Sequence, residues 1–325
     1  FLYWVGLITL LLAACVWCTV QVLPHDLQAA AQVALSPVIV LAAVLNDRPA
    51  HIDCGDFSLL RRYERARKEE VVALQTLTDK VYMGNVVSGV NAADTIAMSS
   101  ILFGGRDKIE QTPASISLIN CNSPLRWDDR MLESQFEYSS AAQPVVLTPF
   151  ILMGAMSPVT IPAALVQQIT EALSGIALSQ LIRPGAPVIF GSFLSNIDMQ
   201  SGSPTFGTPE SGIGLLCTGQ IARHFGLPFR TGGGLTSSQV ADGQAGYEAL
   251  MTMMPTFLAG ANWVMHSAGW LEGGLVAGYE KFIMDIEILQ MLQHEFTPLE
   301  IDDASIGFDA HEEVGHGGHF LGAMH

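Results

Sequence analysis

The chain has 325 residues, of which 49% are hydrophobic and 14% are charged, and its formal net charge is -16 at pH 7. The length suits a single α/β barrel, with or without an appendage, and the composition provides ample apolar material for its core. The charge argues against a nucleic-acid partner, because Lys and Arg hold a phosphate backbone and the chain has only 15 of them.

The first 45 residues form an apolar segment that differs from the rest of the chain. Residues 1–22 contain no charged side chain and are long enough to span a bilayer. No Lys or Arg precedes Arg48 to orient such a span, and no later stretch resembles a membrane protein. We therefore expect a cytoplasmic protein with its main domain at 46–325, and a membrane anchor at 1–22 is the alternative.

The five cysteines, at positions 15, 18, 54, 121 and 217, are scattered along the chain. An odd and scattered set does not indicate a disulfide framework, so a reducing compartment is the simpler prediction. Cys15 and Cys18 form a CxxC pair inside an apolar run, whereas reactive pairs need polar surroundings, so we assign them no redox role.

Residues Ser58–Leu77 are predicted to form a helix that carries a dense group of basic side chains. The group consists of Arg61, Arg62, Arg65, Arg67 and Lys68. A solvated helix face is the default interpretation of such a run, and a docking face for an acidic protein is the alternative.

Strand-like and helix-like runs alternate from Asp79 onward. The expected strands are Val81–Val87, Ile116–Cys121, Pro144–Phe150, Ala186–Phe193, Pro228–Thr231 and Ala261–His266. The expected helices are Ala92–Phe103, Asp128–Ala142, Pro162–Leu181, Ile213–Phe225, Ser238–Leu258 and Tyr279–His294. Strand followed by helix, repeated with short connections, predicts parallel pairing through right-handed crossovers. Because polar or unusual residues follow many of the strands, a barrel is favoured, in which all of them meet on one face.

The segment Ser195–Glu210 is expected to be a long irregular loop after a buried strand. It is rich in Ser, Gly, Pro and Thr, and its only charged residues are Asp198 and Glu210. Loops of that length inside a domain are usually functional or disordered. At the carboxyl end of a parallel sheet, this loop is predicted to form the floor or lid of an active site.

Two glycine-rich runs follow later strands. Gly232–Gly234 come directly after the fifth expected strand, where either a flexible turn or a close approach of a ligand to the backbone explains them. The run from His266 to Gly274 contains Trp270 and Glu272 and follows the sixth strand. A loop at the mouth of a pocket is predicted there, with a buried core histidine as the alternative for His266.

Five aromatic residues lie at or just beyond strand ends, and three carboxylates lie near them in the sequence. Ring faces and carboxylates together suit a quaternary ammonium ion. The aromatic residues are Phe150, Phe193, Phe206, Trp270 and Tyr279, and the acids are Asp198, Glu210 and Glu272.

The C-terminal segment is rich in histidine. His311, His316, His319 and His325 lie near Glu312 and Glu313, but no tight metal-ligand spacing such as HExxH occurs. We therefore assign no metal ligand and expect His319 to line the pocket instead.

Several stretches from about Leu77 to His325 closely resemble the trimethylamine:corrinoid methyltransferase family. They lie in many strand-end loops and read LINCNSPLRWDDRML, PFILMGAMSPVT, GSFLSNIDMQSGSPTFGTPE, LPFRTGGGLTSSQVADGQAGYE, ANWVMHSAGWLEGGLVAGYEKFIMD and VGHGGHFLGAMH. The resemblance implies a (β/α)8 TIM-type barrel, expected here to be incomplete at both ends. It also implies transfer of a methyl group from a methylated amine to the cobalt of a corrinoid carried by a separate partner protein.

Some members of that family carry pyrrolysine in the barrel and use trimethylamine, whereas others have an ordinary residue there and resemble glycine betaine methyltransferases. This sequence has no pyrrolysine, and we expect the corresponding position in or near Gly232–Gly234, which favours a quaternary, betaine-like substrate. Candidate catalytic residues are Gly233, His266 and Glu210. Candidate substrate-binding residues are Phe150, Phe193, Asp198, Phe206, Trp270, Glu272, Tyr279 and His319.

Beside the corrinoid protein, a homo-oligomer is an expected partner. Two other functions stay open at this point. One is a protein that binds quaternary amines without turnover, and the other is a metal-dependent hydrolase of the barrel type that uses the C-terminal histidines.

Overall fold

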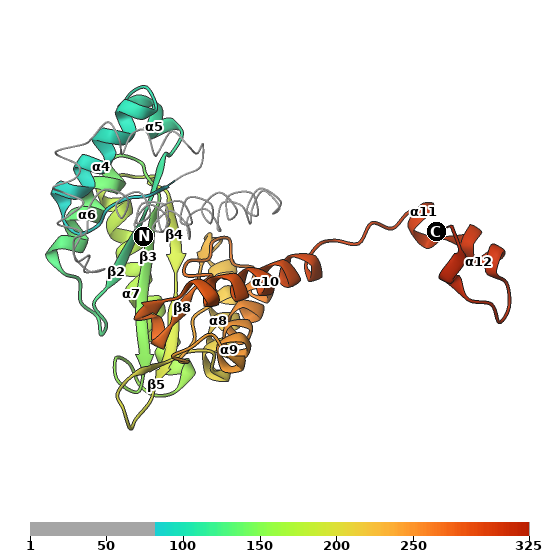
Figure 1. Cartoon of the computed structure of the whole chain (residues 1–325). Helices are drawn as coiled ribbons and strands as arrows, with labels where there is room; N and C mark the ends of the chain where they lie inside the picture. The colour runs from blue at the N-terminus through green and yellow to red at the C-terminus, as the bar shows by residue number, and fades with distance from the viewer. Residues whose placement is uncertain (1–81, 325) are drawn as a thin grey trace, which may run out of the picture. The chain divides into compact units, whose positions relative to one another are not determined.

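Short β-branched and aliphatic runs between Tyr82 and Arg230 form a parallel sheet (Figure 1). The structure, a computed structural model, describes residues 82–324. The chain divides into two compact units, one that ends at Ile288 and one from Leu289 to His325.

The sheet has the order β1-β2-β3-β4-β7, and β5 continues the line of β4 along β3. Its main strands are β1 (Tyr82–Met83), β2 (Ser115–Cys121), β3 (Val145–Met153), β4 (Val188–Gly191), β5 (Phe193–Ile197) and β7 (Phe229–Arg230). All of these pair in parallel, and a single parallel bridge from Arg230 to Trp263 adds the sixth expected strand to the order. Strand order that follows chain order is what repeated strand-helix units predict, and it confirms an α/β fold. Among the described residues the sheet does not close on itself.

Four of the described helices between the strands begin at side chains that cap them. Ser88, Asp128, Thr208 and Asp242 each accept a hydrogen bond from a backbone N–H in the first turn of the helix that follows. The helices of this first unit are α4 (Gly89–Leu102), α5 (Arg106–Gln111), α6 (Asp129–Ser140), α7 (Ile161–Ile182), α8 (Pro209–His224), α9 (Gly243–Leu258) and α10 (Tyr279–Glu295), the last of which runs on past Ile288. All six expected helices are present, and α5 is an addition that the sequence pattern did not predict.

Side chains alternate between the two faces of the sheet. One face packs against the helices, where Ile119 and Leu147 contact a cluster that includes Tyr138 of α6. Phe190 and Phe229 pack in a second cluster on the same face. The other face holds a separate cluster that includes Val146 of β3. Of the functional candidates, Phe150 and Phe193 lie on this second face, which we call the inner face.

α7 is the one helix of the described part that is long and apolar enough to cross a membrane by length and composition alone. It contacts β3 and β4, and small residues such as Ala164 and Ala172 are buried along it. Core helices of α/β proteins pass the same criteria, and these contacts identify α7 as one of them.

Two segments expected to be loops contain hairpins. β6 (Pro204–Thr205) pairs antiparallel with β5, so the segment Ser195–Glu210 is a β-hairpin followed by the start of α8 and is not irregular throughout. β8 (Trp270–Leu271) and β9 (Val276–Ala277) flank the short helix η1 (Glu272–Gly274). Antiparallel pairing across so few residues leaves little periodic signal, which explains why the sequence pattern missed both hairpins.

The second unit contains α11 (Asp303–Ile306), α12 (Phe308–Val314) and the short helix η2 (Phe320–Gly322). The expected apolar segment 1–45, the alternative membrane span 1–22 and the basic helix Ser58–Leu77 all lie outside the described residues.

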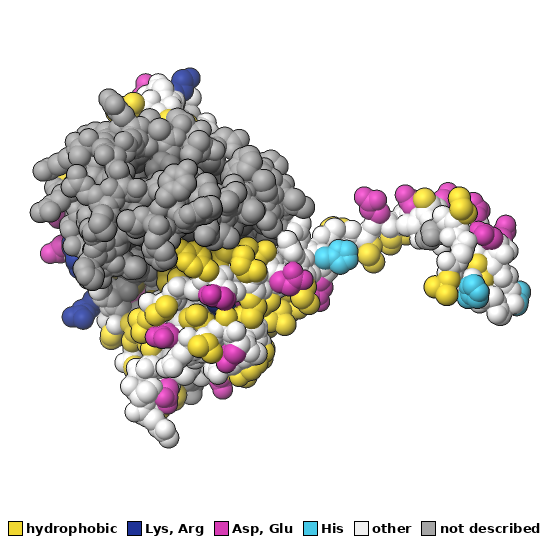
Figure 2. Space-filling view, in the orientation of Figure 1, with side chains coloured by type: hydrophobic (Ala, Val, Ile, Leu, Met, Phe, Trp, Pro, Cys, Tyr) yellow, Lys and Arg dark blue, Asp and Glu magenta, His cyan; other side chains and the backbone are white. Residues whose placement is uncertain are grey.

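Exposed hydrophobic side chains gather on the first unit. Figure 2 shows them, interspersed with acidic side chains, where Figure 1 places α8 and α9. Exposed members on these two helices include Ile213, Tyr247, Met251 and Leu258. Apolar surface of this kind is typical of a contact face rather than of a fully solvated one.

Candidate active site

Three rows of side chains cross the inner face of the sheet. Neighbouring rows are two residues apart along each strand, because every second side chain points to the same face. The lowest row is apolar and contains Leu118, Val146 and Ile189, in which Val146 is the direct partner in register of both neighbours. The middle row is polar. The uppermost row, nearest the carboxyl ends of the strands, contains Phe150 paired with Phe193.

The middle row runs through five adjacent strands. Asn120 pairs with Thr148, Gly191 pairs with Arg230, and Arg230 is bridged to Trp263. A Cβ atom on Gly191 would overlap Thr148 Oγ1. The absence of a side chain at Gly191 therefore leaves room for the threonine hydroxyl. Three polar atoms of this row are buried without a hydrogen-bond partner among the described residues, namely Thr148 Oγ1, Arg230 Nε and Trp263 Nε1.

Arg230 is the largest almost completely buried side chain among the residues that the structure describes, with 1% of its surface exposed. Its Nη1 donates a long hydrogen bond of 3.4 Å to the carbonyl oxygen of Ser192. Burial lowers the pKa of the guanidinium to about 10, so it stays charged at neutral pH. A buried cation normally has an anion beside it. No salt bridge to Arg230 occurs within residues 82–324.

His266 lies in a bend three residues after Trp263. Its backbone is in the left-handed region, with φ of 57°, and its buried Nδ1 has no partner in the described part of the chain. The ring meets Trp270 edge to face at 5.2 Å between centroids. Burial, with a smaller effect of the Arg230 charge, lowers the pKa of His266 to about 3. The imidazole is therefore neutral at physiological pH.

We expect the ring of His266 to show no titration between pH 8 and 5 in ¹⁵N NMR spectra, with its signals assigned by their loss in His266→Gln. The unfolded chain takes up a proton near the ordinary histidine pKa of 6.5, whereas the folded chain does not until about 3. Stability from this group is complete above pH 6.5 and is lost as the pH falls, by up to about 1.4 kcal/mol per pH unit. A ring that titrates near 6.5 would contradict the buried, neutral assignment.

Four of the five aromatic residues predicted to form a cage lie together in one cluster. Phe150 and Phe193 stack at 5.1 Å between ring centroids, and Phe206 meets Phe193 edge to face at 5.5 Å. Trp270 and Leu235 pack against the same cluster. Phe206 reaches the cluster because the β5/β6 hairpin turns the chain back, and its backbone N–H donates to Ser237 Oγ at 2.9 Å.

The Gly232–Gly234 loop is closely packed and held by buried charged groups. A Cβ on Gly234 would overlap the Ser267 carbonyl oxygen, and one on Gly233 would lie 2.8 Å from the Met265 carbonyl oxygen. Lys281 Nζ donates to the Gly234 carbonyl oxygen at 2.9 Å and to the carboxylate of Asp285. Glycine at these positions therefore has a packing reason, independent of any role in catalysis.

The Lys281–Asp285 pair and Glu248 connect this loop to two helices. Asp285 Oδ2 accepts from the backbone N–H of Gly269 at 2.8 Å, and burial raises its pKa while lowering that of Lys281. Glu248 on α9 accepts from Thr236 Oγ1 at 2.6 Å and from the Ser237 backbone N–H at 2.8 Å. Both strand-end loops are thus fixed by carboxylates from the helices behind them.

The three acids expected in the cage do not join the aromatic cluster. Glu210 is exposed in the first turn of α8, and Glu272 is exposed with a φ of 51°. Asp198 accepts from the backbone N–H groups of Gln200 and Ser201 and from Ser201 Oγ, which lowers its pKa. It stabilises its own turn. Tyr279, at the start of α10, is 60% exposed and is also outside the cluster.

The C-terminal histidines lie in the second unit. His319 is exposed, and His311 and His316 line a hollow of about 500 Å³ together with Phe308, Glu312 and Gly315. Within residues 82–324, no three His, Cys, Asp or Glu side chains converge in a way that could hold a metal ion. His325 lies outside the described residues.

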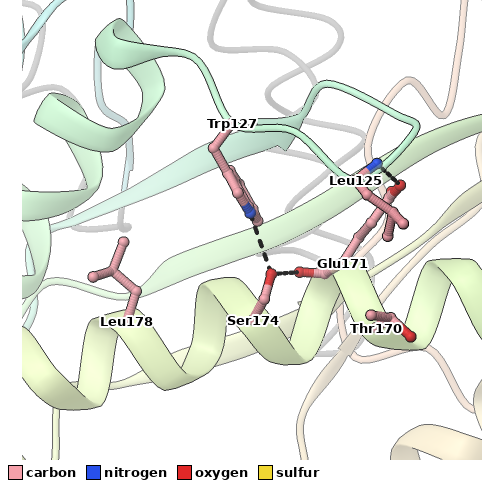
Figure 3. Close-up of a pocket in the computed structure, with 6 residues that line it drawn as sticks. All are labelled: Leu125, Trp127, Thr170, Glu171, Ser174 and Leu178. Carbon is pink, nitrogen blue, oxygen red and sulfur yellow. Dashed lines mark hydrogen bonds between the residues drawn. The ribbon is translucent and has the colours of Figure 1, made fainter.

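A separate cavity of about 380 Å³ lies between α7 and the loop that follows β2 (Figure 3). Glu171 is its buried carboxylate, and it already accepts from Ser123 Oγ, the Leu125 backbone N–H and Gln167 Nε2. Trp127 Nε1 donates to Ser174 Oγ at 3.2 Å on the cavity wall. These polar groups already have partners, so this cavity offers less to a ligand than the inner face does.

Arg230, Trp263 and the Lys281–Asp285 pair were not among the residues that the sequence singled out. A signal for Arg230 was present, since it is a charged residue in an apolar strand directly before a glycine run. The i, i+4 spacing of Lys281 and Asp285 is common on solvated helices, so nothing in the sequence indicated that this pair is buried.

Comparison with known proteins relates most of the chain to one enzyme family. Residues 65–325 match the trimethylamine methyltransferase (MTTB) family. Glycine betaine methyltransferase of Desulfitobacterium hafniense (strain Y51) is 43% identical over 248 residues, which are 76% of this chain and 52% of that protein. Trimethylamine methyltransferase MttB of Desulfitobacterium hafniense (strain DSM 10664 / DCB-2) is 32% identical over 258 residues, 78% of this chain and 51% of the relative.

Trimethylamine methyltransferase MttB of Methanosarcina barkeri is 30% identical over 220 residues, 67% of this chain and 44% of the relative. The chain therefore spans about half the length of the curated relatives that it matches. The family match covers most of the chain, including all strands of the parallel sheet and both strand-end loops, and on that basis the chain belongs to the trimethylamine methyltransferase family.

Proposed function

We propose that the protein is a cytoplasmic methyltransferase that moves a methyl group from a quaternary amine to the cobalt of a corrinoid carried by a separate protein. The observation that carries the proposal is the aromatic cluster of Phe193 and Phe206, which are buried, with Phe150 and Trp270, which are partly buried, near the carboxyl ends of the strands. Aromatic faces attract a quaternary ammonium, which has no proton to donate and cannot be held by hydrogen bonds. Family membership and the 43% identity to a glycine betaine methyltransferase support the same reaction.

The reaction requires little of the protein beyond binding the quaternary amine and aligning its methyl group. The nitrogen of a quaternary amine already carries its positive charge, so the C–N bond can break with both electrons moving to nitrogen, and a neutral tertiary amine leaves without a general acid. The corrinoid, as the accepting co-substrate, supplies the nucleophilic cobalt. The aromatic cluster would bind the cation, exclude water and fix the direction of the methyl group for in-line attack.

A neutral His266 fits this role. A protonated imidazole beside the cluster would repel a cationic substrate, whereas burial keeps the ring uncharged at neutral pH. We propose that His266 and the tightly packed Gly233 shape the wall of the site. The exposed or separately engaged residues Asp198, Glu210, Glu272, Tyr279 and His319 carry no role in this proposal.

We further propose that the parallel sheet is part of a (β/α)8 barrel within a methyltransferase domain at 46–325, apart from the apolar segment 1–45. Successive parallel strands with helices on one face and polar and aromatic side chains at the carboxyl ends support this arrangement. Self-association into a homo-oligomer stays a prediction.

The proposed function predicts binding and turnover of quaternary amines. The purified chain and a reduced corrinoid protein would be mixed with glycine betaine, carnitine, proline betaine or trimethylamine, and the demethylated amine measured by mass spectrometry. Calorimetry would measure binding in parallel. We expect Trp270→Ala to weaken binding of the preferred quaternary amine about tenfold, the size of a desolvated cation–π contact.

Trp127→Ala is the matched control, because Trp127 lines the cavity outside the inner face and its loss should leave affinity unchanged. Binding without a demethylated product would instead identify a protein that captures quaternary amines without turnover. Preference for trimethylamine over all quaternary amines would refute the proposed substrate class.

A further inference from the structure

One buried ion pair on α10 holds a backbone group in each of two strand-end loops. Lys281 Nζ donates to the carbonyl oxygen of Gly234 at 2.9 Å. Asp285 Oδ2 accepts from the backbone N–H of Gly269 at 2.8 Å, and the two charged side chains bond to each other. Lys281 is 0% exposed and Asp285 is 1% exposed, so water does not compete for these bonds.

The residue after each of the two glycines belongs to the aromatic cluster. Leu235 follows Gly234 and is a buried member of the cluster, and Trp270 follows Gly269 and packs against it. The carbonyl group of Gly234 lies in the same planar peptide unit as the Cα atom of Leu235, so fixing one restricts the other. The Gly269 N–H fixes the backbone one residue before the indole ring.

The other ring positions of the cluster are held differently. Phe150 and Phe193 are direct partners in the parallel sheet, whose ladder sets where their side chains start. Leu235 lies in a loop outside any strand, and Trp270 lies in a hairpin whose strands have two residues each. For these two members, directed bonds from the ion pair do what sheet register does for the phenylalanines.

Stability alone does not explain a buried ion pair at this place. Removing two charges from water costs about as much as their attraction returns, and apolar residues of similar volume often give an equally stable or more stable fold. Apolar residues could not donate to the Gly234 carbonyl oxygen or accept from the Gly269 N–H. The distinct contribution of the pair is therefore the geometry of the two loops.

We infer that Lys281 and Asp285 are positioning residues, which act through the loop backbone to hold Leu235 and Trp270 where they complete the aromatic cluster for ligand binding. The inference rests on the proposed function, because it takes the cluster as the site of the quaternary ammonium. It assigns the pair a role in affinity that is separate from its effect on folding.

A stable variant without the pair tests the position of Trp270 in the absence of ligand. Lys281→Met/Asp285→Leu removes both charges together and should keep most of the stability. In protein labelled with 5-fluorotryptophan, the ¹⁹F signal of Trp270, assigned by its loss in Trp270→Phe, should shift or broaden. The signal of Trp127, which lines the separate cavity, should stay in place. An unchanged Trp270 signal in the folded variant would overturn the inference.

Calorimetry with tetramethylammonium and glycine betaine tests the effect on the site. We expect Lys281→Met/Asp285→Leu to bind roughly three- to tenfold more weakly than the unaltered chain, at most the loss expected for Trp270→Ala. In a Trp270→Ala background, removal of the pair should cause little further loss, because the ring that it positions is already absent. Equal losses in both backgrounds would show a general structural effect and refute the positioning role.

A second double variant tests one of the two bonds. Lys281→Met/Asp285→Asn is uncharged but keeps an acceptor for the Gly269 N–H. The Trp270 signal should therefore stay near its place, and most of the affinity should remain. If Lys281→Met/Asp285→Leu does not fold, this variant decides, since a displaced Trp270 signal in it would count against the inference.

Glu171 provides the matched control. It is a buried carboxylate on α7 that accepts from the Leu125 backbone N–H at 2.8 Å, and the loop after β2 that it holds adds no residue to the aromatic cluster. Glu171→Met should lower stability and move the Trp127 signal, but it should leave the Trp270 signal and the affinity per folded molecule unchanged.

The outcomes distinguish this inference from the proposed function. If the folded unaltered chain binds neither ligand, the proposed function is refuted, and the role of the pair in binding with it. If the unaltered chain binds and Lys281→Met/Asp285→Leu binds equally well, the inference alone is overturned and the quaternary-amine site remains.

Discussion

Replacing Asp285 with Ala is expected to lower the free energy of unfolding by about 3–5 kcal/mol, the range for breaking a buried ion pair by removal of one partner. The substitution would leave the ammonium of Lys281, which is 0% exposed, without its anion. It would also take the acceptor from the backbone N–H of Gly269. Urea denaturation followed by circular dichroism would measure the change.

The chain contains a matched control for this prediction. Arg106 and Glu110 on α5 have the same i, i+4 spacing as Lys281 and Asp285, but their side chains are 42% and 27% exposed. Arg106→Ala should therefore cost less than about 1 kcal/mol. The double variant Lys281→Met/Asp285→Leu should recover much of the loss of Asp285→Ala, because it removes both charges together. A single variant as stable as the unaltered chain would show that the pair is solvated and not buried.

Phe193→Ala is expected both to destabilise the fold and to weaken binding of a quaternary amine. Phe193 is 9% exposed and contacts both Phe150 and Phe206, so its removal should cost about 3–5 kcal/mol through lost burial and the resulting cavity. Loss of a ring face from the cluster should also weaken binding at least tenfold. Denaturation would measure the first effect and calorimetry the second.

Phe190→Ala separates the two effects, because Phe190 lies three residues away on the opposite face of the same strand line. It is 0% exposed and packs against Phe229 toward the helices. We expect a similar loss of stability with unchanged affinity per folded molecule. If the Ala variants do not fold, the corresponding Leu variants make the same comparison. Equal losses of affinity at the two positions would mean that Phe193 acts only through stability.

The sequence predicted the alternating strands and helices because that pattern depends on local periodicity. The β-branched run from Val145 and the capped start at Asp128 carry their structural signals within a few residues. The strand-end positions of Phe150 and Phe193 followed from the same pattern. Their convergence required only that the strands be parallel and adjacent.

Other parts of the site depend on contacts between distant segments, which periodicity does not encode. Phe206 joins the cluster through a hairpin whose two strands pair over only two residues each. Glu210 and Glu272 were expected beside the aromatic cluster because they lie near its residues in the sequence. Both are exposed, since a side chain near a strand end can still point to solvent. Arg230 looked like an ordinary polar residue at a strand end, and only the structure shows that it is almost completely buried and forms no salt bridge within residues 82–324.

The constant register between β3 and the line of β4 and β5 has a consequence for how this site can change over time. The polar row and the row of rings are two residues apart on β3, and the pairing of Val146 with Ile189 and of Phe150 with Phe193 keeps the same spacing on the neighbouring strand line. Substitutions in the surrounding loops can alter how tightly a ligand is held, but they leave this spacing unchanged. Selection for a larger or smaller ligand would therefore have to act on side chains of the rows themselves.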